Sequence, residues 1–337
     1  MPPEVTVLMP LYNAKDFLSE AIESILNQTF DDFEFLIIDD SNDGSYEIAK
    51  KFEAQDNRVR VIRNEPPLGL RKSSNIGIKE AKGTYIARME ADDISMPNRL
   101  EEQVHFMKTN PEVDISGCNI KLFGNESGFW TYPQTDDEIK AGLIWGITVA
   151  HPTTIMKRDF LINGNHFYVE DGLPYAEDRE FFYDMHKQAV FKNMHDTLYY
   201  YRRTGGSVTK RMKDKRQQIR KKLLSKIFRD YGVDFNDDEI LLHQFILGDF
   251  FIEVSKENII KAKNWCDKLV KHNREKGIYN QEVFQKLTEQ RWERLFYFLM
   301  NENKKLAKTY FKISEKSYKG HKSYYFKLTL NNFIGRK

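Results

Sequence analysis

The sequence predicts an α/β protein in which a mostly parallel sheet flanked by helices is followed by an α-helical C-terminal region. Up to residue 209, short β-branched or aromatic runs alternate with stretches of helical periodicity, which is typical of such a sheet. Beyond that point the strand signals stop, and the remaining segments have helical spacing. We therefore expect a first domain over residues 1–209 and a helical region over residues 210–337.

The individual elements follow from the same patterns, taken in chain order. Strands are expected at 5–9, 33–38, 58–62 and 84–89. Apolar residues at helical spacing predict helices at 14–28, 69–81 and 96–108, the last with Pro97 in its first turn, where a missing N–H costs nothing. In the C-terminal region, helices are expected within 211–228, 236–254, 257–272 and 281–300.

Composition narrows the class of protein. With 337 residues and 40% hydrophobic side chains, the chain can bury a sizeable core, and its net charge of +2 gives no general reason to expect nucleic-acid binding. Cys118 and Cys266 lie far apart in different contexts, which favours reduced cytosolic thiols. No signal peptide is visible, and the longest apolar stretch, 141–150, is about half of a membrane span. We expect a cytoplasmic protein, or one peripheral to a membrane.

Polar side chains gather where three of the predicted strands end. The first strand is followed by Pro10-Leu11-Tyr12-Asn13, the second by residues 39–45, and the fourth by the acidic residues Glu90, Asp92 and Asp93. In open α/β sheets ligands bind beyond the carboxyl ends of the strands, where strand order reverses. Neither G-x-G-x-x-G nor a P-loop is present, so carboxylates remain, and carboxylates hold a diphosphate by sharing Mg²⁺ or Mn²⁺ with it.

Each of these stretches also has an ordinary explanation. Residues 39–45 alone are typical of a turn and helix cap, and two neighbouring acids occur often by chance. Their joint placement at strand ends of one sheet is what favours a site, because unrelated turns would be scattered over both edges.

Several stretches together resemble a known family. VTVLMPLYNA, SILNQTFDDFEFLIIDDSNDGS, NIGIKEAKGTYIARMEADDISMPNRLEEQ, HPTTIMKRDF and YAEDREF occur in this order, and they resemble the inverting family 2 glycosyltransferases of GT-A fold. The resemblance covers residues 4–209 and does not reach the helical region. It implies transfer of a sugar, as hexosyl or N-acetylhexosaminyl, from a nucleotide donor to an acceptor hydroxyl.

The resemblance also implies roles for the nucleotide-binding residues. The segment Pro10, Leu11, Tyr12 and Asn13 would contact the nucleotide, with the Tyr12 ring beside the base. Asp40 would accept the uracil N–H and so reject cytosine, which lacks that donor. Arg71, followed by Lys72, falls in a segment that often borders the nucleotide, although a basic pair on a helix is more often only solvated.

For the acidic cluster, the resemblance implies a D-x-D-type metal site. Asp92 would lie near the ribose, and Asp93 would ligate the Mn²⁺ or Mg²⁺ ion that bridges the two phosphates. Relatives often read D-A-D-D at this position, so Glu90 keeps the charge on a longer side chain.

The catalytic base implied by the resemblance is Asp178, with Glu177 beside it in AEDREFF. A carboxylate there would take the proton of the acceptor hydroxyl during an in-line displacement. By local pattern alone, acids in a first helical turn are explained by the helix dipole.

Two departures from the family pattern bear on the phosphate side. Relatives often carry a histidine after a Tyr-Arg pair, and here Arg202, Arg203 and Thr204 stand instead. An arginine can serve the diphosphate by charge, whereas a third metal ligand from this loop is put in doubt. His151 matches a position that is often histidine, with a structural role at least as well supported as a catalytic one.

The predicted partners are a UDP-sugar donor and a glycan or lipid-linked saccharide acceptor, as in bacterial surface polysaccharide biosynthesis. Basic and aromatic residues recur over 304–337 and suit either an anionic membrane surface or a packed helix with its lysines in water. Two other classes stay open: a sugar-1-phosphate nucleotidyltransferase, and a catalytically inactive nucleotide-sugar-binding protein. The donor sugar cannot be read from any motif.

Overall fold

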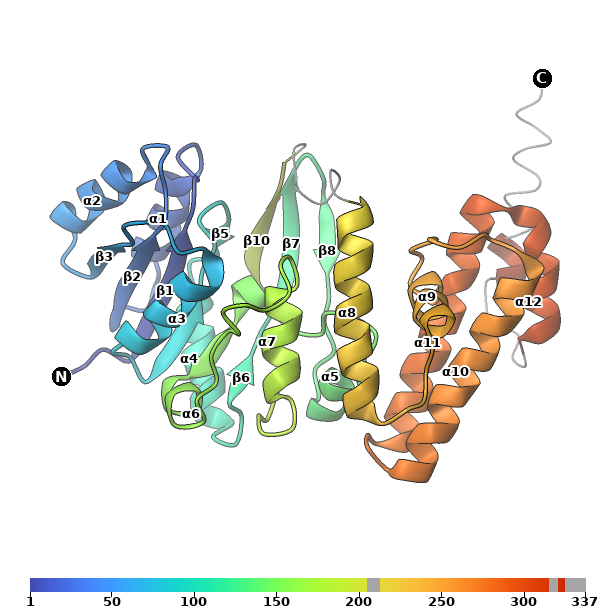
Figure 1. The fold of residues 1–337 in the computed structure, drawn as a ribbon. Coiled ribbons are helices and arrows are strands. Elements are labelled where there is room, and N and C mark those ends of the chain that lie inside the picture. Colours follow the sequence, from blue (N-terminus) through green and yellow to red (C-terminus); the bar gives the residue numbers. More distant parts are fainter. Residues whose placement is uncertain (205–212, 315–320, 325–337) are drawn as a thin grey trace, which may run out of the picture. The chain divides into compact units, whose positions relative to one another are not determined.

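The protein is divided into two compact units, Met1–Arg216 and Gln217–Lys337 (Figure 1). The computed structural model describes residues 1–204, 213–314 and 321–324. The predicted boundary between residues 209 and 210 lies outside the described residues. A parallel-rich sheet in the first unit and helices in the second confirm the predicted fold class.

A six-stranded sheet forms the centre of the first unit, in the order β3-β2-β1-β4-β9-β6. Strands β3, β2, β1 and β4 are parallel to one another, β9 is antiparallel to β4, and β6 is antiparallel to β9. The strands are β1 (Val5–Leu11), β2 (Phe33–Asp39), β3 (Val59–Arg63), β4 (Tyr85–Arg88), β6 (Ile115–Ser116) and β9 (Ile155–Lys157).

Helices connect the successive parallel strands, and β1 and β2 carry α3 packed against them. The predicted helix at 96–108 begins only at Arg99, so Pro97 precedes the helix and does not lie in its first turn. The helices of this unit before β10 are α1 (Leu18–Leu26), α2 (Ser45–Gln55), α3 (Leu70–Glu80), α4 (Arg99–Thr109), α5 (Asp136–Gly142), η1 (His151–Thr153), α6 (Arg158–Asn163) and α7 (Glu177–Met185).

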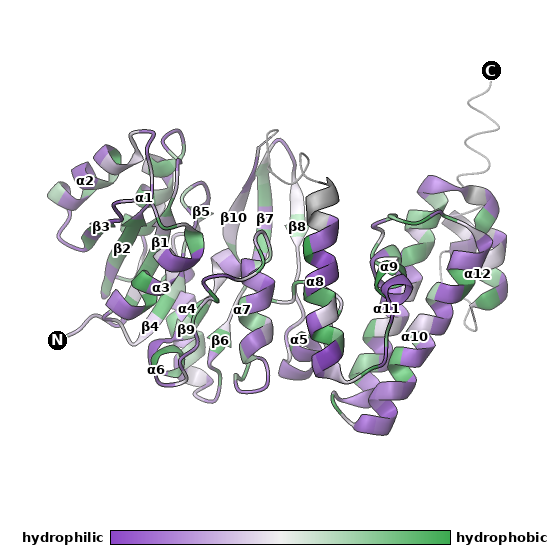
Figure 2. Ribbon diagram, in the orientation of Figure 1, coloured by the Kyte–Doolittle hydropathy of each residue, from purple (hydrophilic) through white to green (hydrophobic). Residues whose placement is uncertain are grey.

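The core lies around the middle strands of this sheet. All seven residues of β1 are buried, as are six of the seven in β2. Figure 2 shows these strands in green, whereas α2 carries purple stretches. A parallel sheet is covered on both faces, so its central strands are continuously apolar and do not alternate.

The order of the strands reverses beside β1, which pairs with β2 on one side and β4 on the other. Leu11 lies opposite Asp39 in the register of β1 and β2. The carboxyl ends of these three strands therefore meet at one edge of the sheet, which is the switch point where open α/β sheets bind ligands. Pro10 and Leu11 belong to β1 itself, two residues beyond the predicted end of that strand.

A second, four-stranded sheet was not predicted from the sequence. Its order is β5-β10-β7-β8, with β10 antiparallel to β5 and parallel to β7. Two of its strands have only two or three residues, and β10 joins partners far away in the chain, so local periodicity carries little signal. The strands are β5 (Ile94–Ser95), β7 (Asn119–Gly124), β8 (Gly128–Trp130) and β10 (Thr197–Arg203).

The second unit consists, among its described residues, of helices. Asn236 and Glu239 form a capping box at the start of α9, and Ser255 caps α10. The helix α8 (Lys213–Tyr231) leads into this unit, followed by α9 (Asp237–Ile246), α10 (Lys256–Lys276), α11 (Gln281–Glu302), η3 (Lys304–Leu306) and α12 (Ala307–Ile313).

Part of the basic and aromatic segment 304–337 packs inside this unit. Tyr310 is fully buried, stacks on Trp292 at 4.9 Å between ring centroids, and donates its hydroxyl to the Trp292 carbonyl. Most of the remainder, residues 315–320 and 325–337, lies outside the described residues. None of the described helices has the length and apolarity needed to cross a membrane.

Candidate active site

A cavity of about 570 Å³ opens at the switch point of the large sheet. Its lining comes from the ends of β1, β2 and β4 and from the start of α3. It consists of Pro10, Tyr12, Asn13, Ala14, Phe17, Asp40, Pro67, Gly69, Leu70, Glu90, Ala91 and Asp92. Five predicted site residues and the neighbouring acid Glu90 are thereby brought together. The other lining residues were not predicted, because apolar and glycine residues carry no chemical signature: Ala14, Phe17, Pro67, Gly69, Leu70 and Ala91.

The segment after β1 forms one wall of the cavity. Tyr12 is 68% exposed, so its ring is free to pack against a planar ligand. Asn13 has a φ of 48°, a left-handed conformation that asparagine tolerates, and its side chain accepts the Asn42 N–H at 3.0 Å. Leu11 is only 1% exposed and belongs to the core, so this member of the predicted set does not line the cavity.

Asp40 is a buried residue of the cavity lining, and its hydrogen bonds hold the segment before α3 in place. One carboxylate oxygen accepts the Asn64 side-chain amide at 2.7 Å, and the other accepts the Gly69 N–H at 2.5 Å. Gly69 has a φ of 87°, which a residue with a Cβ rarely adopts. Asp40 thus has an observed role in shaping the segment before α3, beside its predicted role toward uracil.

The acidic residues after β4 face different surroundings. Glu90 and Asp92 line the cavity, whereas the side chain of Asp93 is 1% exposed and accepts the Arg202 N–H of β10 at 2.7 Å. Burial, together with the charges of Asp92 and Glu90, raises the pKa of Asp93 to about 8. Asp93 Oδ1 is thus directed toward β10, whereas its buried Oδ2 has no hydrogen-bond partner among the described residues, and Asp92 is the aspartate that lines the cavity. The role of Asp93 as metal ligand stays a prediction.

Arg202, which lies on β10, holds the acidic segment in place through hydrogen bonds. Its Nε donates to the Asp92 carbonyl at 2.7 Å, and its guanidinium also binds Glu20. The same guanidinium lies between the rings of Phe17 and Phe123, 4.8 and 4.4 Å from their centroids. An arginine held in this way positions the acidic segment.

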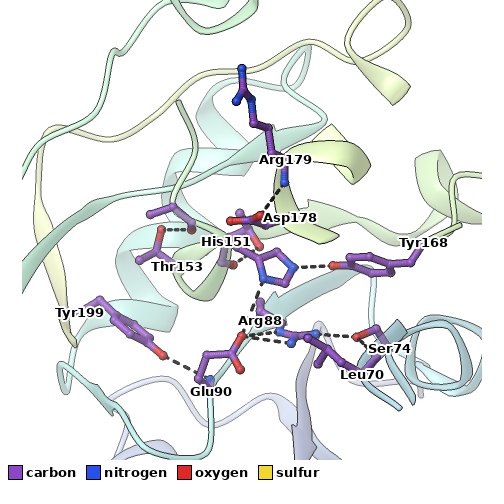
Figure 3. Close-up of polar contacts among 12 residues, drawn as sticks. Leu70, Ser74, Arg88, Glu90, His151, Thr153, Tyr168, Asp178, Arg179 and Tyr199 are labelled. Atoms are coloured by element: carbon purple, nitrogen blue, oxygen red, sulfur yellow. Dashed lines mark hydrogen bonds and ion pairs between the residues drawn. The ribbon is translucent and has the colours of Figure 1, made fainter. Parts of the chain in front are cut away.

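Glu90 is embedded in a polar network that Figure 3 shows. Its Oε1 accepts two hydrogen bonds from Arg88, at 3.1 and 3.0 Å, and its backbone N–H donates to the Tyr199 hydroxyl at 3.2 Å. Burial raises the pKa of Glu90, while Arg88 opposes the shift. Arg88 is 1% exposed and also donates to Ser74, so it fixes the orientation of the Glu90 carboxylate.

Asp178, the predicted base, is the second residue of α7. Its Oδ1 accepts the N–H of Arg179 at 2.7 Å, and burial raises the pKa of its carboxyl, helped by the neighbouring charge of Glu177. Figure 3 shows Asp178 on one side of the His151 ring and Glu90 on the other. The carboxylate of Asp178 is therefore near the acidic end of the cavity, although the two come from distant parts of the chain.

His151 is buried between these groups. Its Nε2 shares a hydrogen bond of 2.5 Å with the Tyr168 hydroxyl, and its Nδ1 lies 3.8 Å from Glu90. Burial and the charge of Arg88 lower the pKa of His151 well below its usual value, so the imidazole is neutral. A buried, neutral and hydrogen-bonded histidine is suited to a structural role, in which its ring separates Glu90 from Asp178.

Arg71 is not among the residues that line the cavity, and its binding of the nucleotide stays a prediction. Its guanidinium is buried against Glu180 of α7 at 2.9 Å, and it donates to the carbonyls of Val169 and Leu173. Lys72 instead reaches toward Glu170 at the surface, at 3.6 Å. Arg71 therefore links the start of α3, beside the cavity, to the helix that carries Asp178.

Replacing Arg71 by methionine is expected to lower the free energy of unfolding by about 3 to 5 kcal/mol, because Glu180 is left as an unpaired buried charge. Both side chains of this pair are less than a tenth exposed, at 9% and 7%. Urea unfolding measures the difference. The matched control is Lys72→Met, whose ion pair is exposed and is expected to contribute less than about 1 kcal/mol. Equal losses in both variants would contradict the burial argument.

The fold and the site define a class of protein. A parallel-rich sheet with carboxylates at its switch point, a cavity with an exposed aromatic wall and a further carboxylate nearby are the parts of a GT-A-type glycosyltransferase. Residues 6–173 match the family described as Glycosyl transferase family 2. The chain belongs to this family of glycosyltransferases.

Relatives and solved structures agree with this assignment. The glycosyltransferase GlyG of Streptococcus pneumoniae is 31% identical over 221 residues, covering 60% of this chain and 72% of the relative. The O-antigen biosynthesis glycosyltransferase WbnJ of Escherichia coli is 35% identical over 166 residues, covering 47% and 63%.

Among solved structures, S. aureus TarS 1–349 in complex with UDP-GlcNAc superposes with a TM-score of 0.57 at 18% identity, covering 85% of this chain and 90% of that one. The mannosyltransferase PcManGT from Pyrobaculum calidifontis, in complex with GDP-Man and Mn²⁺, gives 0.51 at 15% identity, covering 90% and 89%. At these identities the likeness concerns the fold.

Proposed function

We propose that this protein is an inverting glycosyltransferase that moves a sugar from a UDP-sugar to a hydroxyl of a glycan or lipid-linked acceptor in surface polysaccharide biosynthesis. The observation that carries the proposal is the arrangement of carboxylates, with Glu90 and Asp92 on the cavity and Asp178 beyond His151. Donor-side acids and a separate carboxylate for the acceptor are what an in-line displacement requires.

The nucleotide would lie between the ring of Tyr12 and the floor at Asp40. Tyr12 is exposed for stacking, and Asp40 is a carboxylate that lines the same cavity. The Asp40 oxygens already accept from Asn64 and Gly69, so a uracil N–H would share an acceptor whose orientation is fixed in advance.

A divalent cation fits the residues that are present. Asp92 and Glu90 offer oxygen ligands to the cavity, and burial raises the pKa of both carboxyls, as expected where a cation would offset their charge. Within the described parts of the chain no group of three His, Cys, Asp or Glu residues is placed to hold a metal by itself. Diphosphate oxygens would complete the ligand set, which is the usual mode for Mg²⁺. When bound, Mn²⁺ or Mg²⁺ would offset the charge that develops on the leaving diphosphate.

In the proposed reaction the acceptor oxygen forms a bond to the anomeric carbon while the bond from that carbon to the diphosphate oxygen breaks. The proton of the acceptor hydroxyl goes to the Asp178 carboxylate, and UDP leaves with the bonding electron pair. Arg88 holds the Glu90 carboxylate, and Arg202 holds the Asp92 backbone, so both donor-side acids are fixed before the donor arrives.

Removal of divalent metal is expected to abolish both UDP-sugar hydrolysis and tight UDP binding. The test is calorimetric UDP titration and donor hydrolysis on the full chain, with MnCl₂ and after EDTA treatment, over a panel of UDP-sugars. Metal-independent UDP binding without turnover for any donor would instead indicate a catalytically inactive nucleotide-sugar-binding protein. Absence of UDP binding under all conditions would overturn the proposal.

A further inference from the structure

An aromatic cluster lies on one face of the small sheet, next to the candidate active site. The rings of Trp130 on β8 and Tyr201 on β10 are 5.4 Å apart between centroids, at an angle of 41°. Between their strands runs β7, whose Leu122 pairs with Tyr201 and is buried. The two rings therefore lie above an apolar floor and form a continuous surface.

This face of the sheet is turned toward the donor-side acids. Tyr199, two residues before Tyr201 on the same strand, accepts the Glu90 N–H with its hydroxyl. Side chains two residues apart on a strand share a face, so the Tyr201 ring lies on the side of the acidic segment. The charges of Asp93, Asp92 and Glu90 accordingly add to burial in raising the pKa of Tyr201 to about 12.

Tyr132 extends the same surface toward the candidate base. The chain leaves β8 at Trp130, and the Tyr132 N–H donates to the Asn119 side chain at 3.0 Å, which fixes its backbone. Burial raises the pKa of Tyr132, and the nearby Tyr201 and Asp178 contribute to the shift. Tyr132 is thus within electrostatic range of Asp178, as Tyr201 is of the donor-side acids.

We propose that Trp130, Tyr132 and Tyr201 form the acceptor subsite and that it takes a pyranose ring. A transferred sugar must pass from the donor-side acids to a hydroxyl held at Asp178, so the acceptor ring has to lie near both, and these aromatics lie on the sheet face beside Glu90. In this respect the inference rests on the proposed function. The C–H face of a pyranose packs on an aromatic ring, and phenolic hydroxyls can hydrogen-bond to its oxygens.

The exposure of Trp130 supports an occupant of this kind. Trp130 remains 39% exposed on the last strand of the sheet, with the Arg203 guanidinium 5.8 Å from its ring centroid. Arg203 is paired with Glu126 at 3.2 Å, so the aromatic surface is bordered by groups that bind sugar hydroxyls. An exposed aromatic side chain with a polar border matches a carbohydrate better than an apolar partner.

The test is saturation-transfer NMR of p-nitrophenyl glycosides of glucose, galactose and N-acetylglucosamine with the full chain in the presence of UDP and MnCl₂. Trp130→Ala is expected to weaken glycoside binding roughly tenfold, while Trp130→Phe keeps most of it. The matched control is Phe129→Ala, because Phe129 is the neighbour on the same strand, faces the opposite side and is more exposed, at 64%.

UDP titration of each variant measures donor binding separately from glycoside binding, and it also shows whether the donor side is folded. Glycoside signals that depend on Trp130 in a protein that binds no UDP would leave the subsite standing and remove the proposed function. Glycoside binding that is equal in wild type and Trp130→Ala would overturn the subsite. The subsite is also overturned if Phe129→Ala loses as much binding as Trp130→Ala, or if no glycoside of the panel binds wild type.

Discussion

Asp178→Asn is expected to lower the rate of sugar transfer by roughly 100- to 10,000-fold, because asparagine cannot take the acceptor proton. UDP affinity should stay within about twofold of wild type, since Asp178 does not line the nucleotide cavity. Single-turnover transfer from the best UDP-sugar, together with calorimetric UDP titration, separates the chemical step from donor binding.

Glu177→Gln provides the control for this experiment. Glu177 is the adjacent acid on α7, and its carboxylate accepts the Tyr175 N–H at 3.0 Å, a bond that glutamine can retain. We expect transfer rates close to wild type. If Glu177→Gln were the inactive variant and Asp178→Asn the active one, the base would be Glu177.

The pH dependence of transfer gives a second measure of the same group. Burial raises the pKa of Asp178 above the ordinary value of 3.8, and the base works only when deprotonated. Transfer should therefore fall as the pH decreases through this raised pKa, so the acidic limb of the kcat/KM profile lies above the usual range for an aspartate. A rate that is flat down to pH values near 4 would contradict a buried carboxylate as the base.

Asp92→Asn is expected to weaken Mn²⁺-dependent UDP binding roughly a hundredfold, because it removes the aspartate that faces the cavity. Asp93→Asn should leave UDP binding nearly unchanged, since an asparagine at this position can still accept the Arg202 N–H with its side-chain oxygen. UDP titrations with and without MnCl₂ measure both effects, and the pair of variants changes one atom in each of two neighbouring residues.

Thermal unfolding of the two variants controls for damage to the fold. The loss in Asp92→Asn should disappear in EDTA, where neither protein has metal to bind. The reverse result, with UDP binding lost in Asp93→Asn and kept in Asp92→Asn, would support Asp93 as the metal ligand, as the family resemblance implies.

Local sequence patterns were sufficient for the four parallel strands of the large sheet, whereas its short antiparallel strands β6 and β9 were not predicted. The apolar runs at 5–9, 33–38, 58–62 and 84–89 each became a parallel strand, because central strands bury both faces and so read as continuous hydrophobic stretches. The small sheet was not predicted because two of its strands have only two or three residues and its register depends on pairs such as Tyr199 with Ser95. Pairs between residues so far apart in the chain produce no periodic pattern in the local sequence.

Most polar residues of the candidate site were predicted, but the directions in which their side chains point were not. Asp40, Tyr12, Asn13 and Asp92 lie around one cavity, as their positions after strands led us to expect. The pairing of Arg71 could not be foreseen, because its partner Glu180 is 109 residues away and no local feature distinguishes a buried, paired arginine from a solvated one. The roles of these residues in binding and catalysis stay predictions.

The sequence by itself determined the alternation of strands and helices, the helical C-terminal region and the placement of acids at the carboxyl end of a strand. These features are encoded in neighbouring residues, whose periodicity reflects burial. Only the tertiary structure decided that Asp92 lines the cavity while Asp93 Oδ1 is directed toward β10, and that Trp130 and Tyr201 meet on one face of the small sheet. Adjacent side chains in a loop are oriented by their contacts, and the contact that turns Asp93 inward comes from Arg202, far along the chain.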